Sequence, residues 1–293
     1  MAACPLRGLT LRREEGTATA LDHVGLVGPD GPALHAEFER LGFRLTPLSR
    51  QSGRLHPNGP VESWGSANRC AMLRHGYIEL LAIIDPVLPA NGLDRLLARY
   101  PGMHILALRM QDEAANLDRL RRTGLDVPGI LHLERAVDDT DPCAPRARFA
   151  RLPLPEAPEG RIQLIRHLTP EAIWQERFMT HPNRAASLDA AILAVADPAA
   201  TAARLSRLAG RPVTPDPVGG FTLELAHGTV RILAPEGLCA VLPGLHPPTL
   251  PFMAGLVVRT EDEAQAVRAL VPDLRPVPAG AMTTAGGAGI VFC

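Results

Sequence analysis

Two histidines, one glutamate and one glutamine stand at matching places in four short apolar segments, and together they could bind a metal ion. His23 and His104 each lie in an apolar run that precedes a helical pattern, whereas Glu79 and Gln163 lie in later apolar runs. Imidazole nitrogens and carboxylate oxygens are common protein ligands of divalent first-row metals. The sequence therefore predicts a divalent metal site at these four residues, without distinguishing zinc, iron, manganese, nickel or cobalt.

Two of these residues have alternative roles. Gln163 could ligate the metal through its amide oxygen or only hydrogen-bond to a bound water. Glu79 lies within the apolar run Tyr77–Ile84, where a buried carboxylate is costly unless a cation or strong donor lies nearby. An ion pair of Glu79 with Arg69 or Arg74 is the alternative to a metal.

Glu79 and His75 are the candidate catalytic residues. Glu79 is the only carboxylate of the set, so it would serve as a ligand and as the base in proton transfer. His75 has the same strand parity as Glu79 and is a candidate acid or base. A dication with one carboxylate ligand keeps about one positive charge, which favours an anionic substrate with two neighbouring oxygens. An enediolate, a catecholate or an α-hydroxycarbonyl compound would meet that requirement.

Four stretches of the chain repeat one layout of an apolar strand, a polar turn, an amphipathic helix and further short strands. Three of the helices are expected to begin beside an acidic residue, where the helix dipole favours negative charge. The opening strands are expected at residues 21–27, 103–108, 188–195 and 252–258. The metal positions are filled only in the first two units, because the third and fourth units carry Ala190, Arg231, Ala254 and Val291 there.

This layout resembles the βαβββ module of the vicinal oxygen chelate superfamily, and within it the glyoxalase-like domain type. The motifs that carry the resemblance are Leu21-Asp22-His23-Val24, Arg40-Leu41-Gly42-Phe43, Gly65-Ser66-Ala67-Asn68-Arg69, Tyr77-Ile78-Glu79-Leu80-Leu81, Trp174-Gln175 and His181-Pro182-Asn183.

The resemblance implies an α+β fold with four βαβββ modules in two pseudo-symmetric halves. Residues 20–170 would form the metal-bearing half, and residues 185–293 a second half without metal ligands. In the superfamily, two modules form a curved sheet that cups a metal, and the resemblance assigns its ligands to His23, Glu79, His104 and Gln163. A fold of this kind hosts many chemistries, so function depends on the site.

Three functions are compatible with the resemblance. The first is a glyoxalase-like lyase or isomerase acting on vicinal oxygens, although glyoxalases usually have glutamate where this chain has Gln163. The second is an extradiol-type Fe(II) dioxygenase with His23, His104 and Glu79 as a two-His, one-carboxylate set. The third is a non-catalytic small-molecule binding or resistance protein, which a salt-bridged Glu79 would favour.

Composition narrows the class of protein. The 293 residues carry a net charge of −1, which argues against nucleic-acid binding, and all basic residues are Arg, which excludes lysine chemistry. No apolar run approaches the roughly 18 residues of a membrane span, and residues 1–19 do not resemble a signal peptide. The five cysteines include no CxxC pair. We therefore expect a cytoplasmic enzyme with a small-molecule substrate and no membrane partner, which could form a homodimer.

Overall fold

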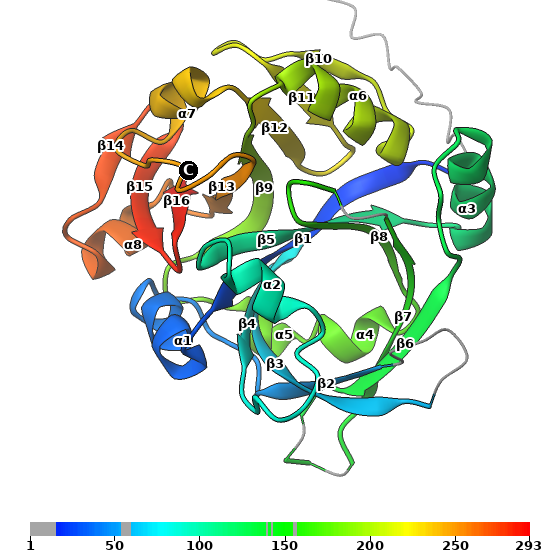
Figure 1. The fold of residues 1–293 in the computed structure, drawn as a ribbon. Coiled ribbons are helices and arrows are strands. Elements are labelled where there is room, and N and C mark those ends of the chain that lie inside the picture. Colours follow the sequence, from blue (N-terminus) through cyan, green and yellow to red (C-terminus); the bar gives the residue numbers. More distant parts are fainter. Residues whose placement is uncertain (1–15, 54–59, 139, 142, 155–156) are drawn as a thin grey trace, which may run out of the picture.

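The computed structural model describes residues 16–53, 60–138, 140–141, 143–154 and 157–293. Its helices and strands repeat the predicted layout four times (Figure 1). Most of the N-terminal segment for which the sequence predicts no signal peptide lies outside the described residues. In the part of the chain that is described, no helix is long and apolar enough to cross a membrane.

The first half of the chain contains two βαβββ modules joined by the short helix α2 (Leu93–Leu97) and followed by α4 (Pro170–Ile173) and α5 (Glu176–Met179). The first module comprises β1 (Ala18–Gly28), α1 (Gly31–Arg40), β2 (Ser49–Gly53), β3 (Glu62–Met72) and β4 (Tyr77–Ile83). The second comprises β5 (Gly102–Met110), α3 (Glu113–Arg122), β6 (Leu131–Ala136), β7 (Arg146–Pro153) and β8 (Arg161–His167).

The second half repeats the arrangement, with the helix α7 (Pro235–Val241) between its two modules. The third module comprises β9 (Ala185–Ala194), α6 (Pro198–Ala209), β10 (Val213–Pro215), β11 (Phe221–Glu224) and β12 (Thr229–Leu233). The fourth comprises β13 (Phe252–Thr260), α8 (Gln265–Leu270), β14 (Arg275–Val277), β15 (Gly280–Ala285) and β16 (Ala288–Phe292). The predicted α+β fold of four βαβββ modules is therefore confirmed.

Three of the module helices begin as the sequence predicts. The side chains of Asp30, Asp112 and Asp197 each accept a hydrogen bond from a backbone N–H three residues later, at 2.9 Å. These aspartates satisfy N–H groups that have no partner within the helix, and their charge suits the positive end of the helix dipole. The capping aspartates thus fix the residue at which each of these three helices begins.

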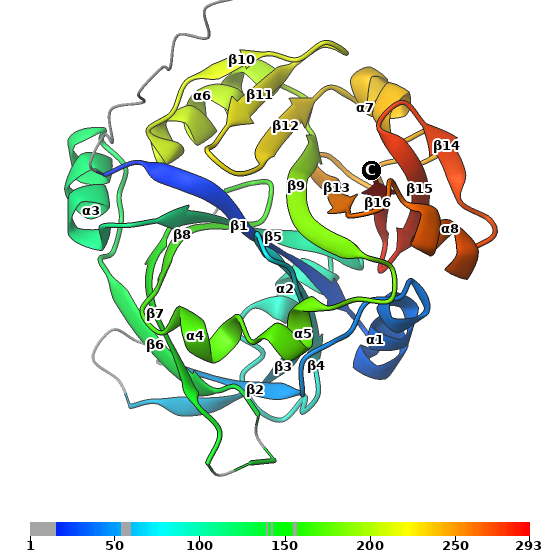
Figure 2. The same ribbon diagram turned by 180° about the vertical axis from the view of Figure 1, so that it is seen from behind.

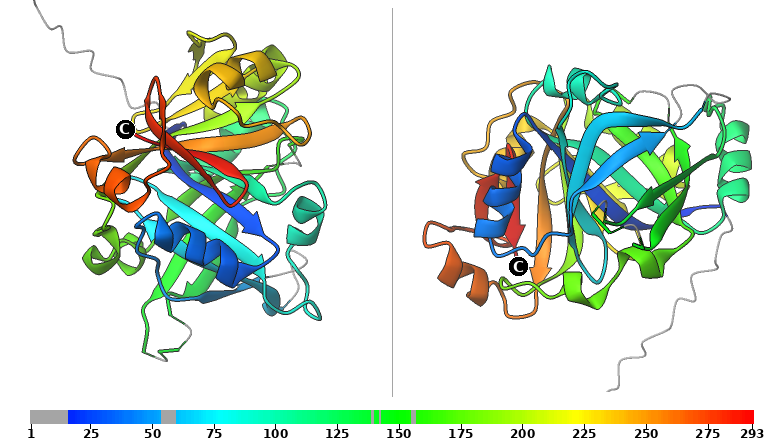
Figure 3. Two further views of the ribbon diagram at one scale, coloured as in Figure 1. Left: turned by 90° about the vertical axis from the view of Figure 1, so that its left-hand side faces the viewer. Right: turned by 90° about the horizontal axis from the view of Figure 1, so that it is seen from below.

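The first half forms a curved sheet with the strand order β2-β3-β4-β1-β5-β8-β7-β6. Its two edge strands meet, because Ser49 of β2 donates a hydrogen bond to the carbonyl of Ala136 in β6 at 2.9 Å. The sheet therefore closes around an interior, which is seen end-on in Figure 1 and from below in Figure 3. We call this interior the cup. Helices α4 and α5 lie across one end of it (Figure 2).

The second half has the equivalent strand order around β9 and β13, but its concave face is filled. Leu238, Val241 and Leu242, in and next to α7, are buried against Ala190 and Ile192 of β9. The two halves pack back to back through one shared apolar core, which contains Val24 and Leu106 as well as Leu193 and Leu256. Among the described residues, the concave face of the second half is thus filled by side chains, whereas the first half surrounds the cup.

Candidate functional site

A bulge in β1 positions the first site residue. The pairing of β1 with β5 passes from Leu21–Leu108 to His23–Ala107, so Asp22 is an extra residue in β1. A bulge of this kind re-aims the side chains around it. Asp22 is fully buried, and its Oδ1 accepts a hydrogen bond from Nδ1 of His23 at 2.8 Å. Because Nδ1 makes this bond, Nε2 is the ring nitrogen of His23 that faces Glu79.

Asp22 is held as a carboxylate by three donors. Nε2 of His167 lies 3.0 Å from its Oδ1, and Nε of Arg109 donates to its Oδ2 at 2.7 Å. Burial opposes ionisation, but the charge and hydrogen bond of His167, together with those of His23, outweigh it. They hold the pKa of Asp22 well below its usual value. An ionised, immobile Asp22 therefore fixes both the tautomer and the ring orientation of His23.

Glu79 lies on β4 beside His23. Its Oε2 is 4.0 Å from Nε2 of His23, and its Oε1 accepts a hydrogen bond from the amide of Asn68 on β3. The predicted alternative partners lie elsewhere, since Arg69 pairs with Glu39 and Arg74 with Glu261. A carboxylate oxygen and an imidazole nitrogen thus face each other across a short gap.

Gln163 and two arginines form the facing wall. Nη1 of Arg151 donates to Oε1 of Gln163 at 3.2 Å, and Arg161 donates to the carbonyl of Asn91. Burial lowers the pKa of Arg151 to about 10, and the nearby charge of Arg161 adds to the shift. Both guanidinium groups remain charged at neutral pH, which makes this wall electropositive.

The cup holds a small inner cavity that continues into a wider groove. The inner cavity has a volume of about 90 Å³ and is walled by His23, Gln163 and the aromatic rings of Trp64, Tyr77 and Phe149. The groove beside it has a volume of about 660 Å³. The two spaces share the side chains of Trp64, Asn91, Arg151, Arg161 and Gln163. A ligand can therefore extend from the His23 end into the groove.

His104 does not join the other three predicted ligands. The β1–β5 pairing passes from Gly25–Ile105 to Leu26–Met103, so His104 is itself a bulged residue. Its counterpart in the first module is Asp22, whereas Ile105 is the counterpart of His23 and lines the cavity. The prediction that His104 matches His23 is wrong by one residue, and one residue in a strand redirects the side chain.

The surroundings of His104 are those of a core side chain. Its Nε2 donates to the carbonyl of Tyr100 at 2.7 Å, and its ring stacks on that of Tyr100 with centroids 4.0 Å apart. Tyr100 in turn packs against Phe252 of the second half. Burial lowers the pKa of His104 to about 4, so the ring is neutral at pH 7.

His75 also lies outside the cup, contrary to its predicted role. It is exposed in the turn before β4, and its ring stacks on His227 of the second half with centroids 4.7 Å apart. The strand parity that places Glu79 in the cup does not extend back to His75, because Gly76 has a φ of +81°. A positive φ breaks the alternation of an extended strand.

A family model for the glyoxalase-like domain matches residues 21–209, which is more than half of the chain. The chain belongs to the glyoxalase-like domain family. It has the vicinal oxygen chelate fold inferred from the sequence. A search of curated proteins finds no match.

Solved structures similar to this glyoxalase-like protein share its fold at low sequence identity. A hypothetical protein from Staphylococcus aureus is 12% identical with a TM-score of 0.65, over 94% of this chain and 98% of the other. A mutant of 4-hydroxymandelate synthase from Streptomyces coelicolor is 15% identical with a TM-score of 0.52, over 87% of this chain and 74% of the other.

The described side chains of this glyoxalase-like protein do not fit a three-ligand metal centre. Within the described ranges, no group of three His, Cys, Asp or Glu residues is arranged to hold a metal ion. His23 and Glu79 are two donors, but the oxygen of Gln163 already accepts from Arg151. The charges of Arg151 and Arg161 also oppose a cation nearby. A metal ion at this site remains a prediction.

Sequence reasoning missed the residues that support His23 and Glu79. Asp22 belongs to the motif Leu21-Asp22-His23-Val24, and its Leu-Asp pair recurs at 188–189. Arg109, His167 and Arg151 come from distant strands, so no local pattern marks them. The recurrence of Leu-Asp was the available signal for Asp22.

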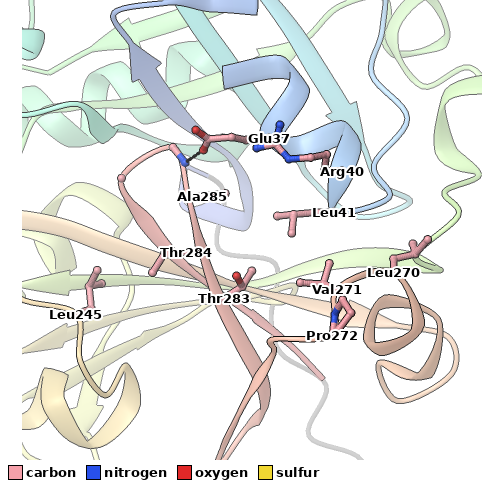
Figure 4. Close-up of a pocket in the computed structure, with 12 residues that line it drawn as sticks. Glu37, Arg40, Leu41, Leu245, Leu270, Val271, Pro272, Thr283, Thr284 and Ala285 are labelled. Atoms are coloured by element: carbon pink, nitrogen blue, oxygen red, sulfur yellow. Dashed lines mark hydrogen bonds between the residues drawn. The ribbon is translucent and has the colours of Figure 1, made fainter. Parts of the chain in front are cut away.

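A larger pocket of about 740 Å³ lies between α1 and the turn after β15 (Figure 4). Its walls are mostly apolar, and Glu37 accepts a hydrogen bond from the backbone N–H of Gly286 at 2.6 Å. None of the predicted site residues lines this pocket. The chemistry-bearing side chains are gathered at the cup instead.

Proposed function

We propose that this chain is an isomerase or lyase of the glyoxalase-like type, which moves a proton on a small molecule with two neighbouring oxygens. The observation that carries the proposal is the 4.0 Å separation of His23 Nε2 and Glu79 Oε2 beside the cavity of the cup. Two proton acceptors at this spacing suit a substrate that exchanges one proton at carbon and another at oxygen.

In the proposed reaction Glu79 is the base that removes the proton from carbon. Asn68 holds one oxygen of its carboxylate, which leaves the other free to face the substrate. His23 accepts the proton of the neighbouring hydroxyl through Nε2 and returns it to the former carbonyl oxygen. Protonated Glu79 returns its proton to the adjacent carbon of the enediolate, so both residues end in their starting states. Both groups would touch the reacting atoms, so both are assigned as catalytic residues.

Asp22 acts through His23 as a positioning residue. Its carboxylate accepts the Nδ1 proton and would stabilise the imidazolium that forms when Nε2 takes up a proton. The aspartate is itself fixed by Arg109 and His167. The ring of His23 is also stacked on Tyr77, with centroids 4.3 Å apart. Preorganisation of this kind lowers the cost of charge formation during the reaction.

Hydrogen–deuterium exchange tests the proposal. The protein is incubated in D₂O with hydroxyacetone, dihydroxyacetone, lactate and pyruvate, and NMR follows deuterium at the carbon next to the carbonyl or carboxyl group. We expect exchange of at least one compound, and a decrease of roughly 10²- to 10⁴-fold in the Glu79→Gln variant. A wild-type protein that exchanges none of them faster than buffer contradicts the proposal.

Metal dependence is a separate part of the proposal. If a divalent ion assists the reaction, His23 and Glu79 are the residues that would supply its ligands. Metal analysis of the purified protein should then show loss of the ion in His23→Ala and full retention in His104→Ala. An equal loss of bound metal in both variants would indicate that His104 is also a ligand.

The other two functions have less support. An extradiol-type dioxygenase would need a second histidine in the cup, and His104 stacks on Tyr100 instead. A non-catalytic binding function would not account for the arrangement of His23 and Glu79. Oxygen uptake on catechols would favour the dioxygenase, and ligand binding without exchange would favour the binding protein.

A further inference from the structure

Arg151 and Arg161 are the charged residues that line both the inner cavity and the groove, and the proposed reaction uses neither of them. Arg151 lies on β7 and Arg161 on β8, and both side chains line the inner cavity and the groove beside it. The chain contains no lysine. These two guanidinium groups therefore give the cup its positive charge where the two spaces meet.

Neither arginine has an acidic partner among the described residues. Arg151 donates to the amide oxygen of Gln163, and Arg161 donates to the backbone carbonyl of Asn91. In addition, Nε of Arg151 is buried and has no hydrogen-bond partner in the described part of the chain. A buried donor without an acceptor is costly, so it commonly marks a place where a ligand supplies the acceptor.

Other arginines of the same module are paired. Arg146 and Arg148, also on β7, both form ion pairs with Glu134, and Arg166 on β8 pairs with Glu113. Those three side chains are more than two-fifths exposed. The arginines that face the cup are thus the less exposed ones, and they lack the carboxylate that their exposed neighbours have.

We propose that Arg151 and Arg161 bind a carboxylate group of the substrate, so that the substrate is a small organic acid. The inference rests on the proposed function, because the acid would lie with its reacting carbon toward Glu79 and its carboxylate toward the groove. The planar guanidinium group matches a carboxylate with two parallel hydrogen bonds. The aromatic walls formed by Trp64, Tyr77 and Phe149 suit an apolar body between the two ends.

The charges in the cup agree with a monocarboxylate. Arg135, Arg151, Arg161 and Glu134 line the inner cavity, and Glu79 lies beside it. Three arginines and two glutamates leave about one positive charge, which one carboxylate neutralises. A neutral sugar or diol would leave that charge, and the free Nε of Arg151, without a partner. The arginine side chains of the cup would therefore account for the predicted preference for an anionic substrate.

Binding of acetate tests the assignment without a known substrate. The Nε–Hε NMR signals of the arginines are followed while acetate, neutral acetamide or inorganic phosphate is added up to about 100 mM. We expect acetate to shift the Arg151 and Arg161 signals with saturation in the millimolar range, and acetamide to leave them unchanged. Arg151→Gln and Arg161→Gln should each weaken acetate binding about tenfold or more.

Arg148→Gln is the matched control, because Arg148 lies on the same strand as Arg151 but pairs with Glu134 and lines neither the inner cavity nor the groove. It should leave acetate binding unchanged. Arg151→Lys, which keeps the charge but not the planar pair of donors, should bind acetate with intermediate affinity. It also provides a second variant if Arg151→Gln does not fold.

Four outcomes would overturn the assignment. They are no shift with acetate, an equal shift with acetamide, tighter binding of phosphate than of acetate, and an equal loss of binding in Arg148→Gln. Glu79→Gln separates this inference from the proposed function. Removing that negative charge should tighten acetate binding a few-fold, even if the wild-type protein exchanges no substrate proton.

Discussion

The two halves of the molecule share a framework but differ in what they place inside it. Asp22 and Asp189 are both extra residues at a bulge, and each pairs with an arginine on the neighbouring strand, Arg109 or Arg259. At the position of His23 the second half has Ala190, which is buried against the residues of α7. The bulge and its ion pair therefore belong to the fold, whereas the histidine belongs to the site.

The same comparison holds on the adjoining strand. Glu79 of β4 and Arg231 of β12 occupy equivalent register positions, opposite Gly25 and Ile192. Glu79 faces His23. In contrast, Nε and Nη2 of Arg231 each donate a hydrogen bond to a carboxylate oxygen of Asp216, both at 2.7 Å. At the position where the first half has a carboxylate able to accept a proton, the second half thus has an arginine that is paired with an aspartate. The proposed reaction is therefore assigned to the first half, which encloses the cup.

Substitution of the bulge aspartates should give the largest difference between the halves. Asp22→Asn leaves Arg109 and two histidines beside a buried neutral amide, so we expect the free energy of unfolding to fall by about 3–5 kcal/mol. Asp189→Asn should cost less than about 1 kcal/mol, since its partner Arg259 has a side chain that is 64% exposed. Urea unfolding followed by circular dichroism measures both. Equal losses would mean that the bulge has the same structural role in each half.

His23→Gln tests whether the site depends on the residue that distinguishes the halves. Glutamine cannot take up a proton, so we expect the exchange activity to fall by roughly 10²- to 10³-fold. The melting temperature should change little, because Asp22 keeps Arg109 and His167 as partners. His227→Gln, an exposed histidine of the second half, is the control and should keep full activity. A similar loss in both variants would argue against a catalytic His23.

The histidine at the boundary between the halves should make stability depend on pH. His104 has a folded pKa of about 4, below the value near 6.5 of an unfolded histidine. The unfolded chain therefore binds the proton first, and stability is lost as the pH falls from about 6.5 toward 4. We expect His104→Phe to remove on the order of 2–3 kcal/mol of this dependence. His132→Gln, an exposed control, should leave the dependence unchanged; if it does not, His104 is not the source.

The smallest expected effect concerns the closure of the first half. Ser49 donates to Ala136 and accepts from Arg135 at 2.7 Å, which links the edge strands β2 and β6. Ser49→Ala should cost about 1 kcal/mol and speed amide exchange in both edge strands. Thr222→Val, in the second half, should leave those strands unchanged. Faster exchange throughout the molecule would show that the effect is not local to the closure.

The sequence by itself determined the modules and their helix starts. Strand alternation, amphipathic spacing and capping aspartates are local properties, because neighbouring residues set backbone preference and side-chain face. The same local properties placed His23 and Glu79 each in a strand, and the resemblance implied that they share a site. In the structure these two strands are paired, and Nε2 of His23 lies 4.0 Å from Oε2 of Glu79.

Only the tertiary structure decided which further residues lie beside His23 and Glu79. A bulge adds one residue to a strand, and its place depends on pairing with a strand about 80 positions away. That single residue moves His104 out of register with His23 and brings Ile105 into the cavity. The cup arginines also depend on how the sheet curls and closes. Composition and periodicity do not predict that curvature, because it arises from contacts between strands that are far apart in the chain.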